Sequence, residues 1–359
     1  MPLMSTITPP QVIPASAQDQ LSALLEGTGF ASLPDIGWIR VTGEDRVRWL
    51  NGMTTNSIQQ LKSGESNYNF FLSAQGRIQG DAVALALDSC ILLGTARSRV
   101  PALIELLDRF IIMDDVELSE HSSFGILVAG PHAASTLAAI GIATDDLAPL
   151  HFTAIGPDET GWHRHKIAIL HTHSPLVPRY ELWIESPAAI AELTETLTAS
   201  GATLVDPEAL THLRILEGTP LYGTDIRDKE LPQETAQTRA LHFAKGCYLG
   251  QEIVERIRSR GNVHRTFQAF QLTPVSDQTD LPAPGTILES NSKPVGELTT
   301  TATISLASGP IQLALGYIRR ETLERNSAIT YPGGTASPIA TPFPIKRKEL
   351  LDDWQTGNR

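Results

Sequence analysis

The chain of 359 residues contains only two cysteines, Cys90 and Cys247, and no CxxC motif. This scarcity excludes a disulfide framework, and it excludes a four-thiolate zinc or iron–sulfur site that this chain builds alone. No run of apolar residues approaches the ~18 that are needed to span a bilayer. P-loop, G-x-G-x-x-G and H-E-x-x-H motifs are missing too, which removes the common nucleotide-binding and metalloprotease interpretations.

Positive charge is also scarce, with 28 Lys and Arg against 40 Asp and Glu and a net charge of −12. A broad basic surface for nucleic-acid phosphates is therefore not expected. The N-terminal stretch MPLMSTITPPQVIPASAQDQ has neither a basic segment nor an apolar one, so no signal peptide is predicted. We expect a cytoplasmic protein that binds neither membranes nor, directly, nucleic acid.

What the chain does contain is a mixture of strand-like and helix-like segments without regular βα alternation, which indicates the α+β class. We predict a flexible leader, two α/β subdomains, a small C-terminal β-barrel and a tail, over residues 1–16, 17–114, 115–263, 264–346 and 347–359. The β-α-β-β-α order of the second subdomain is typical of a ferredoxin-like module. The Thr-, Ser-, Pro- and Gly-rich composition after residue 268 favours the barrel.

The segment from His242 to Gly261 is the most informative for chemistry. Its apolar spacing predicts a helix that begins near Gly250, so Cys247 lies in a glycine-flanked loop at the N-terminus of this helix. The helix dipole and the nearby Lys245 both favour a thiolate, which predicts a more reactive thiol than a free cysteine. The alternative is a structural cysteine, which Cys90 in its apolar strand exemplifies.

The eight residues 245–252, KGCYLGQE, resemble the K-G-C-Y-x-G-Q-E signature of the YgfZ family, folate-binding relatives of aminomethyltransferase, the T-protein of glycine cleavage. Further matches to family patterns follow in the right order across residues 35–346, at residues 41–45, 50–56, 74–78, 214–225, 231–234, 294–299 and 314–320. The resemblance implies an aminomethyltransferase-like fold that binds tetrahydrofolate, or a one-carbon-substituted derivative, in a pocket between the first two subdomains. It also implies a role in iron–sulfur cluster assembly or repair, linked to tRNA modification, with iron–sulfur enzymes or assembly factors as partners.

The resemblance assigns roles to individual residues. Glu217 matches the family's pterin-binding glutamate, and a carboxylate suits the adjacent amino group and ring N–H of a pterin. Arg214, one helical turn earlier, is expected to hold Glu217 in place, although an exposed i,i+3 ion pair is the alternative. Asp81 stands where aminomethyltransferases carry two adjacent carboxylates, and it either contacts folate or simply starts a strand.

Two more residues complete the set of cofactor-binding candidates. Asp225 closes the matched 214–225 stretch, and Arg239 lies in the long loop that follows. Arg239 and Arg227 are candidates for the glutamate tail of folate, with solvated loop arginines as the alternative. No metal site is predicted. The histidines of two H-x-H pairs are interpreted as partly exposed strand residues, namely His163, His165, His171 and His173.

Three functions remain open at this stage. The first is the folate-binding accessory protein, with Cys247 and Lys245 as the reactive pair. The second is an aminomethyltransferase that moves a one-carbon unit to tetrahydrofolate with Asp81 as acid–base catalyst. Two departures weaken this second function. The second carboxylate is missing, and Gly94-Thr95 stands where aminomethyltransferases usually carry an asparagine. The third is a one-carbon sensor that does not depend on Cys247.

Overall fold

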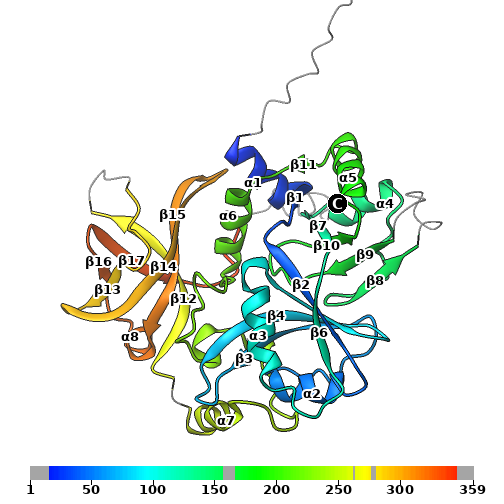
Figure 1. The fold of residues 1–359 in the computed structure, drawn as a ribbon. Coiled ribbons are helices and arrows are strands. Elements are labelled where there is room, and N and C mark those ends of the chain that lie inside the picture. Colours follow the sequence, from blue (N-terminus) through cyan, green and yellow to red (C-terminus); the bar gives the residue numbers. More distant parts are fainter. Residues whose placement is uncertain (1–15, 157–165, 262, 276–279, 346–359) are drawn as a thin grey trace, which may run out of the picture.

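The computed structural model describes residues 16–156, 166–261, 263–275 and 280–345. Two β-sheets lie against each other, helices cover their outer faces, and a separate barrel stands to one side (Figure 1). The expected architecture of two α/β subdomains and a C-terminal barrel is thereby confirmed.

The first sheet has five strands, in the order β3-β4-β5-β2-β6. Their bounds are β2 (Ile36–Thr42), β3 (Ser66–Leu72), β4 (Ile78–Ala86), β5 (Ile91–Ala96) and β6 (Glu117–His121). The outer face packs on α2 (Arg46–Met53), on the short helix η1 (Arg97–Arg99) and on α3 (Val100–Asp108). Alternation along β4 sends Ala82 and Ala84 into this outer core, so Asp81 and Leu85 face the other sheet.

The second sheet has six strands, in the order β11-β1-β7-β10-β9-β8. Their bounds are β1 (Gly29–Ser32), β7 (Phe124–Ala129), β8 (Phe152–Ile155), β9 (Ile167–His171), β10 (Arg179–Ile184) and β11 (Thr203–Leu204). Helices α4 (Ala133–Ala139) and α5 (Pro187–Ala199) cover its outer face. The strands β11, β7, β10 and β9 follow the expected ferredoxin-like plan, with β1 inserted between β11 and β7.

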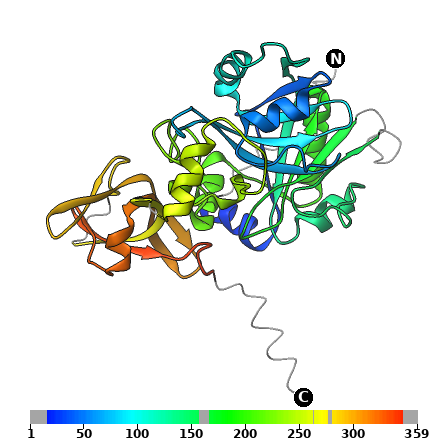
Figure 2. The same cartoon turned by 90° about the horizontal axis from the view of Figure 1, so that it is seen from below.

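The barrel closes from six strands, in the order β12-β15-β14-β13-β16-β17. Their bounds are β12 (Arg265–Pro274), β13 (Ile287–Ser290), β14 (Lys293–Leu306), β15 (Gly309–Arg319), β16 (Thr330–Tyr331) and β17 (Gly334–Ile339), with α8 (Arg320–Glu324) at one end. Helices α1 (Ala17–Glu26) and α6 (Pro207–Glu217) lie between barrel and sheets and share one hydrophobic core with both (Figure 1). Figure 2 shows the barrel projecting from the side of the two-sheet body.

The subdomain boundary differs from the expected one near residue 114. The N-terminal α1 and β1 belong to the second sheet, because β1 pairs with β7 and β11, while β6 pairs back onto β2 of the first sheet. Strand exchange of this kind depends on long-range pairing, which local hydrophobic patterning does not encode. The leader lies outside the described residues up to residue 15, and Ser16 is already the N-cap of α1. The tail after residue 345 also lies outside them.

A long segment connects α6 to the barrel. It carries two short helices, η2 (Pro232–Thr235) and η3 (Thr238–Ala240), and then α7 (Gln251–Arg260). Helix α7 begins where it was expected, and its N-cap Gly250 has a φ of 81°. A side chain there would come within 2.6 Å of the Ser73 carbonyl oxygen, so glycine lets this loop press against the turn that precedes β4. Within the described residues, no helix is long and apolar enough to cross a membrane.

Candidate functional site

Glu217 is the last residue of α6, and the end of this helix determines its position. Gly218 follows in the left-handed conformation with a φ of 68°, and its N–H closes the helix by donating to the Arg214 and Ile215 carbonyls. A side chain at 218 would also come within 2.4 Å of Thr341, so only glycine fits beside the segment that leaves the barrel. The helix therefore ends at Glu217, and this residue lies in the interior of the protein.

The Glu217 carboxylate is only 6% exposed. Its Oε1 accepts hydrogen bonds from the Ser174 hydroxyl and, at 3.5 Å, from the Leu176 backbone N–H. Burial raises the pKa of Glu217, against the opposing effect of the Ser174 hydrogen bond. Within the described residues no hydrogen bond reaches Oε2, so one oxygen of a buried carboxylate is left available for a ligand.

Asp81 forms the second part of the site and lies inside β4, which begins at Ile78, so Asp81 does not start the strand. Its Oδ2 accepts a 2.6 Å hydrogen bond from the Tyr68 hydroxyl on the neighbouring strand β3. Burial raises the pKa of Asp81 to about 6, although the Tyr68 hydrogen bond and the charge of Arg239 oppose this shift. Asp81 therefore titrates near neutrality, where an acid–base group is most effective.

Arg239 connects the two carboxylates. Its guanidinium lies over the Tyr68 ring, 4.3 Å from the ring centroid, and its charge acts on both Asp81 and Glu217. No ion pair within 4.0 Å joins it to either carboxylate among the described residues; its Nε donates instead to Gln237. One arginine thus faces two acids without neutralising them, which leaves an arrangement suited to a polar, hydrogen-bonding ligand.

Arg214 and Asp225 bind each other rather than Glu217. Their closest atoms are 2.5 Å apart, and Asp225 is completely buried. Asp225 also accepts hydrogen bonds from the hydroxyls of Thr299 and Thr300 on β14 of the barrel. The expectation that Arg214 holds Glu217 is therefore corrected: this pair fastens α6 to the barrel. A contact of either residue with a cofactor stays a prediction.

Arg227 likewise belongs to the barrel junction. Its guanidinium contacts Glu230 and Glu297, and Arg265 of β12 contacts Glu234 in the same network. The Arg227 guanidinium is thus engaged through Nη2 with two carboxylates of the junction, so a role for Arg227 with a folate tail has no geometric support.

The Cys247 loop is held in place by Lys245. The ammonium donates to three backbone carbonyls at the end of α2, those of Asn51, Thr54 and Asn56, at 2.6–2.7 Å. Burial lowers the pKa of Lys245 to about 7. Three acceptors match its three N–H groups, so Lys245 works as an anchor for the loop, whereas Cys247 itself is exposed.

Asn56 links this anchor to the carboxylate cluster. Its carbonyl receives Lys245, while its side-chain amide donates to the carbonyls of Arg239 and Tyr68, at 2.9 and 3.2 Å. The Thr55 hydroxyl adds a 2.6 Å bond to the Ala240 carbonyl. The loop with Cys247 and the residues around Asp81 therefore depend on one short segment, 54–56.

The histidine pairs do not form a metal site in the described part of the chain, where no group of three or more potential ligands gathers. His163 and His165 lie outside the described residues. His171 bonds to the Leu147 carbonyl at 2.8 Å, and His173 is exposed within the electrostatic reach of Arg239 and Arg179.

Sequence reasoning missed three members of the site, namely Tyr68, Ser174 and Asn56. Asn56 stands in the matched stretch 50–56, which gave a usable signal. Tyr68 and Ser174 carry no local signal, because each is brought to its carboxylate by strand pairing or by a hairpin of the other sheet.

The N-terminal domain model of the GCVT family matches residues 10–245 of this chain. A putative chloroplastic transferase of Arabidopsis thaliana is 25% identical over 92% of this chain and 74% of its own length. An aminomethyltransferase of Synechocystis is 24% identical over 86% of this chain and 82% of its own. A tRNA-modifying protein YgfZ of Photorhabdus laumondii is 25% identical over 69% of this chain and 72% of its own.

Among solved structures, the glycine cleavage system aminomethyltransferase T of Bartonella henselae superposes with a TM-score of 0.80 at 20% identity. The superposition covers 92% of this chain and 90% of that one, which confirms the fold over all three parts of the molecule. Since the family model also covers well over half of the sequence, this chain is a member of the GCVT family, with an aminomethyltransferase-like architecture.

Proposed function

We propose that this protein binds tetrahydrofolate, or a one-carbon-substituted derivative, at the cluster of Glu217, Asp81, Tyr68 and Arg239. The observation that carries the proposal is the pair of incompletely neutralised carboxylates around one arginine. The Oε2 of Glu217, which accepts no hydrogen bond within the described residues, suits the amino group and ring N–H of a pterin, and Asp81 on β4 is within the electrostatic reach of the same arginine. The residues therefore fit the ligand that the family resemblance implies.

With folate bound, we propose an accessory role in iron–sulfur cluster assembly or repair, exercised in the cytoplasm through the exposed Cys247. Support comes from the hydrogen bonds of Lys245 and Asn56, which connect the Cys247 loop to the folate cluster. A single thiol cannot hold a cluster alone, and partner proteins must supply the other ligands. Iron–sulfur enzymes or their assembly factors are the partners that this chemistry requires.

An aminomethyltransferase is the second candidate, and one observation favours it: the pKa of Asp81 is raised to about 6. A carboxyl that titrates there can exchange a proton with a folate nitrogen during one-carbon transfer. The single carboxylate at 80–81 weighs against it.

The test is complementation in a host that lacks its own YgfZ-type protein, with the activity of an iron–sulfur-dependent tRNA-modifying enzyme as readout. We expect rescue by the wild type but by neither Cys247→Ala nor Glu217→Ala. Cys90→Ala, which removes the buried cysteine instead of the exposed one, is the matched control and should rescue as well. Rescue by Cys247→Ala would overturn the thiol role and leave a folate sensor. A well-expressed wild type that fails to rescue, but transfers an aminomethyl carbon to tetrahydrofolate in a purified assay, would establish the second candidate instead.

A further inference from the structure

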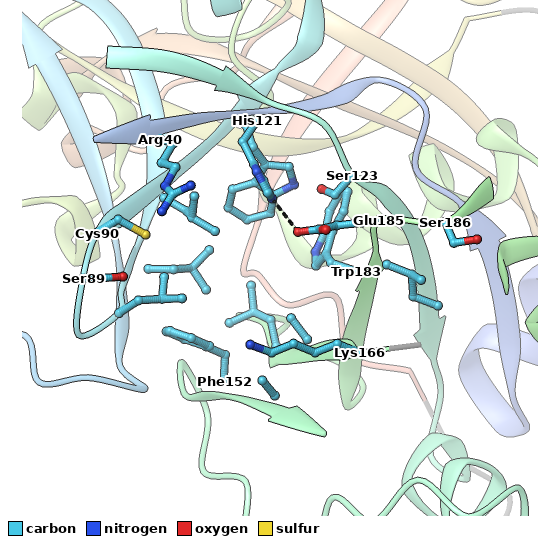
Figure 3. A pocket seen from close by; sticks show the side chains of 18 residues that line it. Arg40, Ser89, Cys90, His121, Ser123, Phe152, Lys166, Trp183, Glu185 and Ser186 are labelled. Atoms are coloured by element: carbon cyan, nitrogen blue, oxygen red, sulfur yellow. Dashed lines mark ion pairs between the residues drawn. The ribbon is translucent and has the colours of Figure 1, made fainter. Parts of the chain in front are cut away.

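A cavity with a volume of about 580 Å³ lies between the two sheets, away from the folate cluster. It is lined from the first sheet by Trp38, Arg40 and Leu85 and from the second by Lys166 and Trp183, among others (Figure 3). Its volume falls in the range of small-molecule sites. None of its lining residues belongs to the folate cluster.

The cavity and the folate cluster lie at opposite ends of the space between the sheets. Along β4 the cluster uses Asp81 and the cavity begins at Leu85, while along β10 the cluster is near Arg179 and the cavity begins at Trp183. Four residues of strand span roughly 13 Å. A ligand in this cavity is therefore separate from one at Glu217.

Two tryptophans, Trp38 and Trp183, form a rigid aromatic part of the cavity wall. The rings of Trp38 and Trp183 meet edge to face, with centroids 5.0 Å apart. Each lies over a glycine of the neighbouring strand, Gly94 or Gly125, where an added side chain would come within 2.8 Å of the ring. This packing fixes both indoles, so the wall that they form is preorganised for a planar apolar group.

The polar groups of the cavity are suited to a ligand that accepts hydrogen bonds. The indole N–H of Trp38, a residue only 3% exposed, has no hydrogen-bond partner among the described residues. Arg40 lines the cavity from the first sheet and Lys166 from the second, and neither is in an ion pair within the described part of the chain (Figure 3). The nearby carboxylate, Glu185, lies 3.9 Å from His121. A buried donor and two free cations together are complementary to an anion.

We propose that this cavity is a second binding site, which takes a small organic anion with a planar apolar body, such as an aromatic carboxylate. The planar part lies against Trp38 and Trp183, the acid group is held between Arg40 and Lys166, and one acceptor atom receives the indole N–H. This site is independent of the proposed folate function.

The test is titration calorimetry of the full chain with naphthalene-2-acetate, and with the neutral naphthalene-2-acetamide as the matched ligand. We expect the acid to bind and the amide to bind at least tenfold more weakly. Arg40→Gln and Lys166→Gln should each weaken binding of the acid about three- to tenfold, while Arg109→Gln, an exposed arginine of another surface, leaves it unchanged. The two cavity residues are exposed, so these variants keep the fold.

Glu217→Gln tests whether the cavity is distinct from the folate cluster. Binding of naphthalene-2-acetate should be unchanged in this variant. Absence of binding, equal binding of acid and amide, or unchanged affinity in both Arg40→Gln and Lys166→Gln would each overturn the proposal. Loss of binding in Glu217→Gln would assign the probe to the other end of the molecule and would overturn it as well.

Discussion

Two charged regions of this molecule use the same residue types in opposite ways. At the barrel junction, the buried Asp225 is matched by Arg214, a backbone N–H and two threonine hydroxyls. At the interior cluster, the charge of Arg239 acts on both Asp81 and Glu217, but no ion pair joins it to either one in the part of the chain that the structure describes. Buried charges with a full set of partners keep the parts of a structure together. Buried charges without such partners make the free protein less stable, and a ligand that pairs with them gains binding free energy.

The largest effect is expected from breaking the matched region with Asp225→Ala. This variant leaves Arg214 half-buried without its carboxylate and removes the acceptor for the barrel threonines, so the free energy of unfolding should fall by about 3–5 kcal/mol. Denaturant unfolding measures it. Glu105→Ala, which removes an exposed ion pair with Arg109, is the control and should change stability by less than about 1 kcal/mol. Similar losses in both variants would contradict the contrast between the regions.

Lys245→Met tests whether the Cys247 loop is anchored as a unit. Three carbonyls of segment 51–56 lose their donor, which should cost about 2–3 kcal/mol and speed hydrogen exchange in residues 241–250. Arg258→Met on exposed α7 is the matched control. Unchanged exchange in the loop would show that Lys245 is dispensable as an anchor.

Glu217→Gln tests the unmatched region by ligand affinity. Replacing the carboxylate with an amide keeps the shape but removes charge-assisted hydrogen bonds, so we expect affinity for 5-formyltetrahydrofolate to fall roughly tenfold to a hundredfold. The thermal midpoint without ligand should fall little, since burial of the charged Glu217 is itself unfavourable. Calorimetry at fixed pH gives the affinity, and an unchanged value would exclude Glu217 from the folate site.

Asp81→Asn should act in the opposite direction and stabilise the fold. The pKa of Asp81 is raised from 3.8 to about 6 in the folded protein, so between these values the folded state binds more protons than the unfolded one. The free energy of unfolding therefore falls as pH rises through this window, and the full cost is present about one pH unit above the folded pKa. The variant escapes this cost, and should be more stable than the wild type by up to about 3 kcal/mol at pH 8 and equal to it near pH 4. A stability gain that does not depend on pH would contradict the assignment.

Local sequence determined much of the architecture. Composition predicted the C-terminal barrel, and apolar spacing predicted α7 and put Cys247 in the loop before it, because composition and amphipathic periodicity are local properties. The family resemblance pointed to Asp81, and the long polar loop pointed to Arg239, although neither signal could say what these residues touch.

Tertiary structure decided the rest, since the remaining features depend on residues that are far apart in sequence. Insertion of β1 into the second sheet, the choice of Asp225 over Glu217 as partner of Arg214, and the three carbonyls beneath Lys245 all require long-range pairing. The cavity at Trp38 and Trp183 exists only where two sheets face each other. Sequence thus specified which chemical groups were present, and packing specified which of their charges remained unpaired.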